Sequence, residues 1–251
     1  MRVKTTDDIR AMKGGDPIAM LTVYDYPTAL ALDTCDLDIL FVGDSLAQTE
    51  LGLASTADIG LEQMLHHLGA VARGVKATHL LADLPFGSYE TADQALEGAR
   101  QLIEAGANSV KLEGPRYEVV EHLVSNGVDV MGHVGLLPQT ARRYRLQGTK
   151  VESAARIHKQ ALRLQETGCY AIVLEFMSHE TAESITQTLN IPTIGIGAGP
   201  GCDGQVLVSS DMLGQFDKVP SYVRKYAYLN ETVAKAARAY RDDVKSGDFP
   251  D

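Results

Sequence analysis

The fold is decided by residues 79–113, which read HLLADLPFGSYETADQALEGARQLIEAGANSVKLE. The apolar runs His79–Leu84 and Ser109–Leu112 each predict a short strand. Between them, Thr91–Ala105 predicts a helix, because it opens on residues typical of a helix N-terminus and Gly106 directly follows its end. The stretch is therefore one strand–helix–strand unit, which is typical of neighbouring parallel strands.

The same alternation continues along almost the whole chain. Eight apolar or β-branched runs predict strands: Ile18–Tyr24, Ile39–Gly43, His79–Leu84, Ser109–Leu112, Val128–His133, Tyr170–Leu174, Pro192–Ile196 and Gln205–Val208. The predicted helices are Tyr26–Leu32, Leu61–Val75, Thr91–Ala105, Tyr117–Ser125, Val151–Thr167, His179–Leu189 and a last one from Ser221 to about Val244. Such alternation predicts a parallel sheet, either closed as a (β/α)8 barrel or open and doubly wound.

The residues at the strand ends favour the closed barrel. Six of the predicted strands end in or next to a polar residue: Asp25, Asp44, Asp83, Glu113, His133 and Glu175. A barrel brings all of these ends to one mouth, whereas an open sheet spreads them along a line at ~4.8 Å per strand. Because convergence makes chemical sense of these side chains, we expect an α/β fold, a (β/α)8 TIM barrel, as a single domain over residues 1–251 with a C-terminal helix.

Charge and composition exclude several classes of partner. With 33 acidic and 23 basic side chains the formal charge is −10, which works against binding nucleic acids or anionic membranes. Residues 1–11 lack the apolar stretch of a signal peptide, and the longest uncharged stretch, Ser184–Cys202, contains prolines and glycines that do not suit a membrane helix. Three cysteines without a C-x-x-C pair suit a reducing compartment, so we expect a cytoplasmic protein.

Three of the strand-end carboxylates, Asp44, Asp83 and Glu113, follow consecutive strands and can reach one point of a barrel mouth. Taken singly, each is as well explained as a surface carboxylate at a helix N-terminus. Together they would repel one another unless a cation balanced them. All-oxygen ligands suit a hard divalent ion, so the group predicts a metal site with Mg²⁺ as the first candidate.

Three further side chains are candidates for chemistry. Lys111 lies two residues before Glu113 and so faces the same side of its strand, where it serves either a structural salt bridge or the negative charge of an acid substrate. Glu175 follows an apolar run that predicts partial desolvation and a raised pKa, suited to a general base, although it could equally cap the next helix. His133 is flanked by glycines that allow close approach of a substrate, yet a lone histidine in a strand is more often a core residue.

Three familiar motifs occur in the chain, but the surrounding residues do not support the function usually associated with each. Gly43–Leu46 matches the GDSL hydrolase signature, but the D-x-x-H pair near the C-terminus that such enzymes use is absent. Gly199–Gly204 satisfies G-x-G-x-x-G but is followed by a strand-like run instead of a helix. His179–Glu183 begins like the zinc-protease motif H-E-x-x-H and ends in glutamate.

The chain resembles the 3-methyl-2-oxobutanoate hydroxymethyltransferase family, also called ketopantoate hydroxymethyltransferase. The resemblance is specific, because seven matching stretches run in order over roughly residues 18–248: Thr22–Tyr26, Val42–Leu46, Ala82–Ser88, Val110–Gly114, Met131–Leu136, Val173–Glu175, and Ile194–Gly199 with Cys202–Val208. It implies a barrel of the phosphoenolpyruvate mutase type, usually a homodecamer, in the pantothenate and coenzyme A pathway.

The resemblance also implies roles for individual residues. Asp44, Asp83 and Glu113 would hold Mg²⁺, the 2-oxo acid would contact Asp44, Ser45, Asp83 and Lys111, and Glu175 would be the catalytic proton acceptor; His133 is added as a substrate-binding candidate. The expected reaction transfers a hydroxymethyl group from 5,10-methylenetetrahydrofolate to 3-methyl-2-oxobutanoate, giving 2-dehydropantoate through a Mg²⁺-stabilised enolate.

The sequence departs from the family's pattern at three places, which are Ala47–Glu50, Arg142–Arg143 and Phe176–Met177. These departures bear on loop geometry and on the folate donor, while the metal-binding positions are intact. The alternatives are a related barrel lyase that acts on a 2-oxo acid without folate, a GDSL-type esterase acting through Ser45, and a non-catalytic barrel that binds a small molecule.

Overall fold

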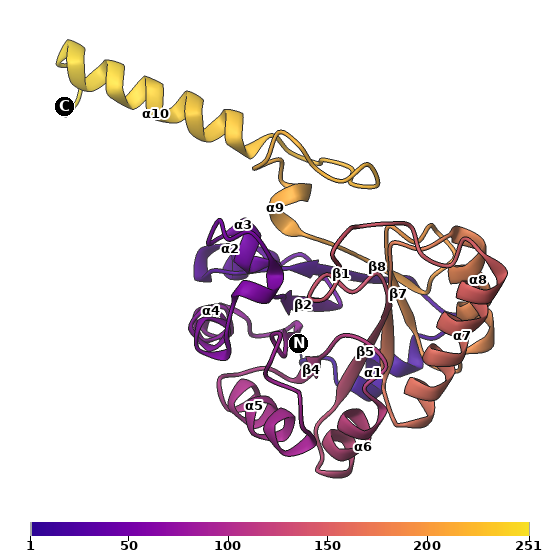
Figure 1. The fold of residues 1–251 in the computed structure, drawn as a ribbon. Coiled ribbons are helices and arrows are strands. Elements are labelled where there is room, and N and C mark those ends of the chain that lie inside the picture. Colours follow the sequence, from indigo (N-terminus) through magenta and orange to yellow (C-terminus); the bar gives the residue numbers. More distant parts are fainter. Residues whose placement is uncertain (1, 251) are drawn as a thin grey trace. The chain divides into compact units, whose positions relative to one another are not determined.

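The computed structural model describes residues 2–250 of the chain. The chain divides into two compact units, the first ending at Val206 and the second beginning at Leu207. Eight parallel strands close into a barrel in the order β1 to β8, with the helices of the first unit around its outside (Figure 1). The prediction of a closed (β/α)8 barrel instead of an open sheet is therefore confirmed.

Every predicted strand is present, with ends that differ from the prediction by a few residues at most. The strands are β1 Ile18–Thr22, β2 Ile39–Val42, β3 His79–Asp83, β4 Ser109–Lys111, β5 Val130–Gly135, β6 Ala171–Glu175, β7 Thr193–Ile196 and β8 Gly204–Leu207. The helices of the first unit are α1 Thr6–Ala11, α2 Tyr26–Leu32, α3 Leu46–Thr49, α4 Leu61–Gly74, α5 Ala92–Glu104, α6 Tyr117–Ser125, α7 Val151–Glu166 and α8 His179–Thr188, with the short 3₁₀ helix η1 Thr56–Asp58.

Two apolar layers hold the barrel together. Phe41 and Leu81 point into the barrel and belong to one buried cluster, while their chain neighbours Leu40 and Leu80 belong to a second cluster between the strands and the helices. Successive strand residues face opposite sides, and a parallel sheet buries both of its faces. This is why the strands read as continuous apolar runs in the sequence.

The caps predicted for α5 are present. The Thr91 side chain accepts a hydrogen bond from the Gln94 N–H, 3.2 Å away, at the N-terminus. Gly106 follows the C-terminus with φ at +117°, and a Cβ at this position would lie 2.6 Å from the Ala72 Cβ. Glycine is therefore required there both by its backbone conformation and by the close approach of α4.

A polar network closes the N-terminal end of the barrel. His79 Nε2 lies 2.7 Å from Ser109 Oγ, which lies 3.0 Å from the Tyr170 hydroxyl, and His79 Nδ1 lies 2.9 Å from the Lys4 carbonyl oxygen. Burial lowers the pKa of His79, so the ring is neutral at neutral pH. Because these buried groups all have partners, this end of the barrel serves stability, and catalytic groups are expected at the opposite, carboxyl end of the strands.

The second unit contains α9 (Ser209–Met212), a stretch of turns and α10 (Leu229–Ser246). The prediction that the last helix begins at Ser221 is wrong, because α10 begins eight residues later. The preceding residues form turns, in which the Tyr226 N–H donates to the Met212 carbonyl 2.8 Å away. This backbone bond joins residues fourteen positions apart, which helical periodicity does not reveal. That one domain covers residues 1–251 stays a prediction.

Candidate active site

The carboxyl ends of β2 to β6 carry the site residues that the sequence predicts. Asp83 and Glu175 end β3 and β6, Asp44 and Glu113 each follow their strand by two residues, and His133 lies within β5. All except Glu175 are buried, with 6% or less of each residue exposed, and the Glu175 side chain is 15% exposed. The partial desolvation predicted for Glu175 is thus present, and the expected convergence of these side chains is confirmed by the contacts below.

Asp83 stands at the centre of the first set of contacts. Its Oδ2 accepts a hydrogen bond from the Asp44 backbone N–H at 3.0 Å, and its Oδ1 lies 2.7 Å from Lys111 Nζ. The strand register explains this ion pair, because Asp83 of β3 lies directly opposite Lys111 of β4. Lys111 Nζ also lies 5.2 Å from the centre of the Phe41 ring inside the barrel.

Burial and like charge give the site unusual electrostatics. Burial, followed by the nearby Asp83 carboxylate, raises the pKa of Asp44 to about 7. Burial, followed by Asp44, raises the pKa of Glu113 well above its usual value. Burial alone would disfavour the ammonium of Lys111, but Asp83, Glu113 and Asp44 outweigh it and raise the pKa of Lys111. Ionising all three carboxyl groups is therefore unfavourable with a single ammonium beside them, and a further cation would favour their charged forms.

Gln139 connects two of the carboxylates and was missed by the sequence reasoning. Its side-chain Nε2 donates to Asp44 Oδ2 at 2.7 Å, and its backbone N–H donates to Glu113 Oε2 at 3.1 Å. The Tyr89 hydroxyl donates to Gln139 Oε1, so the amide is held from both ends. Gln139 lies on the loop after β5, 95 positions from Asp44, and only the stretch Met131–Leu136 just before it could have drawn attention to it.

His133 lies between Lys111 and Glu175. Its Nδ1 is 3.4 Å from Lys111 Nζ, and its Nε2 is 3.3 Å from Glu175 Oε2 without a well-aligned hydrogen bond. Burial, followed by the Lys111 charge, lowers the pKa of His133, so the ring is neutral. An ammonium can only donate, which makes Nδ1 the acceptor and leaves the ring proton on Nε2, facing Glu175. The histidine can therefore orient the Glu175 carboxylate.

Ser45, the first residue after Asp44, has a tyrosine as its side-chain partner. The Tyr24 hydroxyl and Ser45 Oγ lie 2.8 Å apart, and Tyr24 is buried. Within residues 2–250, no histidine hydrogen-bonds to Ser45, although a serine nucleophile needs such a base. This arrangement gives no support to the GDSL-type esterase.

The carboxylates suit a divalent cation by their chemistry, although they do not enclose one as they stand. Among the described residues no group of three His, Cys, Asp or Glu side chains is arranged closely enough to hold a metal ion. Within residues 2–250, however, Asp83 Oδ1 is buried with only the Lys111 ammonium beside it, and both Asp44 and Glu113 carry a raised pKa. Rotation of these side chains around a hard cation would supply oxygen ligands of the kind that Mg²⁺ prefers.

Two features singled out in the sequence have structural roles. Asp25 caps α2, since its Oδ1 accepts from the Thr28 N–H at 2.8 Å. Asp203 holds the glycine-rich loop before β8 in place. Its Oδ2 accepts hydrogen bonds from Lys13 Nζ at 2.9 Å and from the Thr193 N–H at 2.8 Å. A strand follows this loop, so the dinucleotide-binding motif is correctly set aside.

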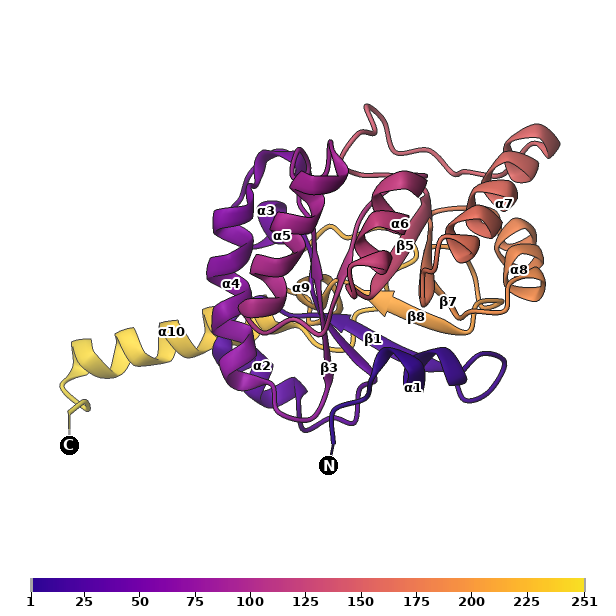
Figure 2. The same ribbon diagram turned by 90° about the horizontal axis from the view of Figure 1, so that it is seen from below.

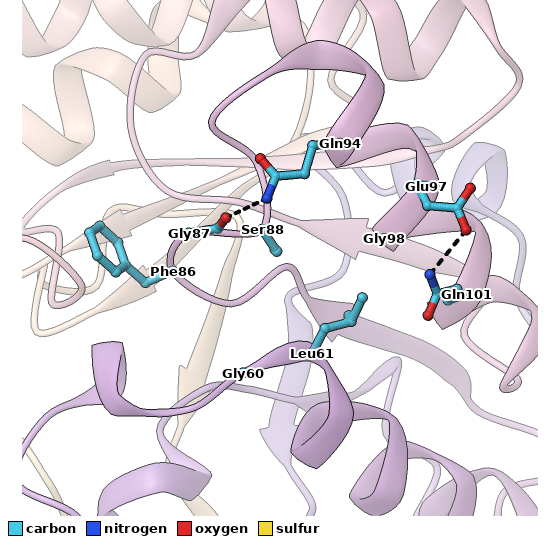
Figure 3. A pocket seen from close by; sticks show the side chains of 9 residues that line it. All are labelled: Gly60, Leu61, Phe86, Gly87, Ser88, Gln94, Glu97, Gly98 and Gln101. Carbon is cyan, nitrogen blue, oxygen red and sulfur yellow. Dashed lines mark hydrogen bonds between the residues drawn. The ribbon is translucent and has the colours of Figure 1, made fainter.

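A pocket of about 420 Å³ lies beside α4 and α5, and none of the predicted site residues is in its lining (Figure 3). Its lining is Gly60, Leu61, Phe86, Gly87, Ser88, Gln94, Glu97, Gly98 and Gln101. Glu97 is the one ionisable side chain among these, and its carboxylate accepts from Gln101 Nε2 at 3.1 Å. A single carboxylate that already has a partner offers no acid–base pair, and we assign this pocket no catalytic role.

Within residues 2–250, none of the helices combines the length and the apolar character needed to cross a membrane. The longest helix, α10, carries charged side chains along its length.

Solved structures share the fold at low sequence identity. The phosphoenolpyruvate phosphomutase from Streptomyces platensis aligns with a TM-score of 0.65 and 12% identity, covering 97% of this chain and 88% of that one. A 2,3-dimethylmalate lyase, described as a member of the PEP mutase/isocitrate lyase superfamily, aligns with a TM-score of 0.61 and 16% identity over 96% of this chain and 88% of the lyase. These likenesses show that the chain shares the barrel fold of these proteins.

Sequence relatives are much closer. The 3-methyl-2-oxobutanoate hydroxymethyltransferase of Thermococcus kodakarensis is 46% identical over all of this chain and 90% of the relative. The enzyme of the same name from Nitratidesulfovibrio vulgaris is 46% identical over all of this chain and 84% of its own length. A family profile described as ketopantoate hydroxymethyltransferase matches residues 3–251. With this match over the whole barrel and its carboxyl-end cluster, the chain belongs to the ketopantoate hydroxymethyltransferase family of transferases.

Proposed function

We propose that this enzyme transfers a hydroxymethyl group from 5,10-methylenetetrahydrofolate to 3-methyl-2-oxobutanoate, giving 2-dehydropantoate for pantothenate and coenzyme A synthesis. The observation that carries the proposal is the buried cluster of Asp44, Asp83, Lys111 and Glu113 facing Glu175 across His133. It combines an ammonium for a small anionic substrate with a carboxylate free to accept a proton.

Glu175 is the proton acceptor in this proposal. Among the described residues it is the one site carboxylate that accepts no hydrogen bond from a backbone N–H or from the Gln139 amide, and His133 Nε2 lies 3.3 Å from its Oε2. The proton it removes is the one on C3 of the 2-oxo acid. As negative charge moves to the keto oxygen, the buried ammonium of Lys111 stabilises it in a water-poor pocket.

Asp44, Asp83 and Glu113 are the side chains that would hold Mg²⁺. When bound, the ion would supply Lewis-acid polarisation of the substrate's oxygens, which makes the C3 proton more acidic. Ser45, which lies after β2 and whose Oγ is 2.8 Å from the hydroxyl of Tyr24 after β1, can contact the substrate's carboxylate.

The proposed reaction consumes one molecule of water. The C3–H bond breaks and its proton passes to Glu175, and C3 forms a bond to the methylene carbon of the donor. Both bonds from that carbon to N5 and N10 of the donor break, water supplies the oxygen of the new hydroxyl group, and tetrahydrofolate leaves with one proton from water and one from C3.

The direct test is incubation with 3-methyl-2-oxobutanoate, methylenetetrahydrofolate and Mg²⁺, followed by mass detection of 2-dehydropantoate. A lyase that acts on 2-oxo acids without folate would convert a substrate with no donor present. An esterase would instead show fluorophosphonate labelling of Ser45, and a binding barrel would bind ligand without turnover.

Replacing Gln139 by Met is expected to weaken binding of a divalent cation by about 10–100-fold, the usual effect of losing a partner that orients a metal ligand. Methionine keeps the length and bulk of the side chain but removes the amide that donates to Asp44 Oδ2. Calorimetric titration with Mg²⁺, or electron paramagnetic resonance with Mn²⁺, measures this affinity without relying on turnover.

The matched control is Gln94→Met, which removes an amide that bonds the Gly87 carbonyl away from the site. The control should bind the cation with wild-type affinity. Equal affinity in Gln139→Met and the wild type would contradict the role given to the amide.

We expect the enzyme to form a homo-oligomer, in keeping with the homodecamer implied by the family. In the second unit, α10 has no buried residue and leaves Val233, Tyr240 and Val244 exposed, an apolar set suited to contact with another chain. Light scattering should give a mass several times that of the 27.1 kDa chain. A monomer at assay concentration would contradict this expectation.

The same proposal places the reaction in the cytoplasm, with small-molecule substrates and neither nucleic acid nor membrane as a partner. Three free cysteines and a net charge of −10 support it.

A further inference from the structure

The loop between β5 and α7 contains a segment, Thr140–Leu146, that we call the strap. One end of the strap is fixed by Gln139, which bonds Asp44 and Glu113. The other end is fixed by Gln147, whose backbone N–H donates to the Phe176 carbonyl at 2.9 Å. Because Phe176 directly follows Glu175, the strap begins at the carboxylate cluster and ends beside the proposed base.

The strap is longer than the distance it must cover. Its two anchors are eight residues apart, which allows a reach of about 27 Å when extended. The carboxyl ends of β4 and β6 are separated by two strand spacings, or about 10 Å. The excess length lets the chain arch, and Figure 2 shows the loop rising from the end of β5 before it descends to α7.

The middle of the strap lies within electrostatic range of the site. Burial, followed by the charges of Glu175, Glu113 and Asp44, raises the pKa of Tyr144. Tyr144 nevertheless remains 57% exposed, so it stands at the boundary between the site and solvent. The strap therefore passes close enough to the reacting carboxylates to contact a second substrate as it enters.

Three of the seven strap residues are arginines. Arg142, Arg143 and Arg145 are exposed, and within residues 2–250 none of their side chains has an ion pair or hydrogen bond, whereas Lys4, Lys13 and Lys111 all pair with an aspartate. Three unpaired cations within four residues are notable in a chain of net charge −10. These three arginines form a positively charged rim beside the pocket that holds the site carboxyl groups.

The rim does not suit the 2-oxo acid, because that substrate is small and Lys111 already provides a buried cation for it. It suits an anionic group on a larger molecule that reaches outward from the site. Guanidinium groups bind carboxylates through paired, parallel hydrogen bonds. A folate donor carries such carboxylates on its glutamate tail, at the end of the molecule opposite the reacting pterin.

We propose that Arg142, Arg143 and Arg145 of the strap bind the carboxylates of the donor's glutamate tail and hold the pterin end over the site. This inference rests on the proposed function, since it takes the donor to be a folate. Two of the departures from the family's pattern, Arg142–Arg143 and Phe176–Met177, lie at the strap and at its anchor.

The test compares donors that differ only in their tails: methylenetetrahydropteroate, which has no glutamate, and the mono- and triglutamate forms of methylenetetrahydrofolate. For the wild type, KM should fall as glutamates are added, and this gain should shrink in high salt because exposed charges are screened. The triple variant Arg142→Gln/Arg143→Gln/Arg145→Gln should raise KM for the triglutamate donor by roughly 3–30-fold, since exposed ion pairs are individually weak. KM for the pteroate donor and for the 2-oxo acid should not change.

The matched control is Arg100→Gln/Arg156→Gln/Lys159→Gln, which removes three exposed charges from α5 and α7 and should leave the preference for glutamates intact. An unchanged KM for every donor in the strap variant, or an equal rise for the tail-less donor, would overturn the inference. If the wild type made no 2-dehydropantoate, the proposed function would fail by itself. Equilibrium binding of tetrahydropteroyltriglutamate to the wild type and the strap variant would then still decide whether the strap binds the tail.

Discussion

Replacing Glu175 by Gln is expected to slow exchange of the C3 proton of 3-methyl-2-oxobutanoate by roughly 10²–10⁴-fold, the usual contribution of a positioned acid–base group. The exchange is measured by NMR in D₂O with Mg²⁺ and without any folate, so it isolates the proton transfer from the one-carbon step. Glutamine keeps the size of the side chain and its contact with His133 Nε2 but cannot accept the proton.

Glu180→Gln is the control for this experiment. Glu180 lies in the first turn of α8, five residues after the proposed base, and is exposed. Its variant should exchange the proton at the wild-type rate. A wild-type rate in Glu175→Gln would remove Glu175 from the role of base and leave His133, 3.3 Å away, as the next side chain to consider.

Removing divalent metal is expected to abolish the complete reaction, and added Mg²⁺ should restore it. The physical reason is that Asp44, Asp83 and Glu113 are three buried carboxyl groups beside one ammonium, so that ionising all of them calls for a further cation. Asp83→Asn should weaken cation binding by at least about 100-fold, the upper end of the effect of losing an outer-shell partner. Calorimetry with Mn²⁺ measures the affinity, and thermal melting checks that the barrel still folds.

Asp93→Asn is the matched control, because Asp93 lies in the first turn of the helix that follows β3 and its side chain is 96% exposed. This variant should bind the cation as the wild type does. Full activity in an excess of chelator, with metal content verified as negligible, would contradict the magnesium role. Normal cation affinity in Asp83→Asn would locate the metal elsewhere.

The sequence alone determined the fold class and the side of the barrel that carries the chemistry. Strand and helix periods are local properties of the chain, and the caps of α5 at Thr91 and Gly106 follow from the chemistry of a few adjacent residues. Because parallel strands all end at one edge of the barrel, the positions of Asp44, Asp83 and Glu113 after three consecutive strands were enough to predict that they meet.

The tertiary structure alone decided which partner each of these side chains has. Asp83 pairs with Lys111 because the strand register sets them side by side, and His133 faces Glu175 because β5 lies next to β6. The positions of the last helix and of Gln139 likewise depend on contacts between distant residues.

Gln139 shows the physical reason most clearly. No local period marks a loop glutamine, and its amide reaches Asp44 only because the barrel closes and the loop after β5 folds back across its mouth. The strap's arginines are visible in the sequence as three charges, but only the two anchors at Gln139 and Gln147 place them beside the site. Periodicity and capping act over a few residues and can be read from the chain, whereas the choice of a buried hydrogen-bond or ion-pair partner is made by the path of loops through space.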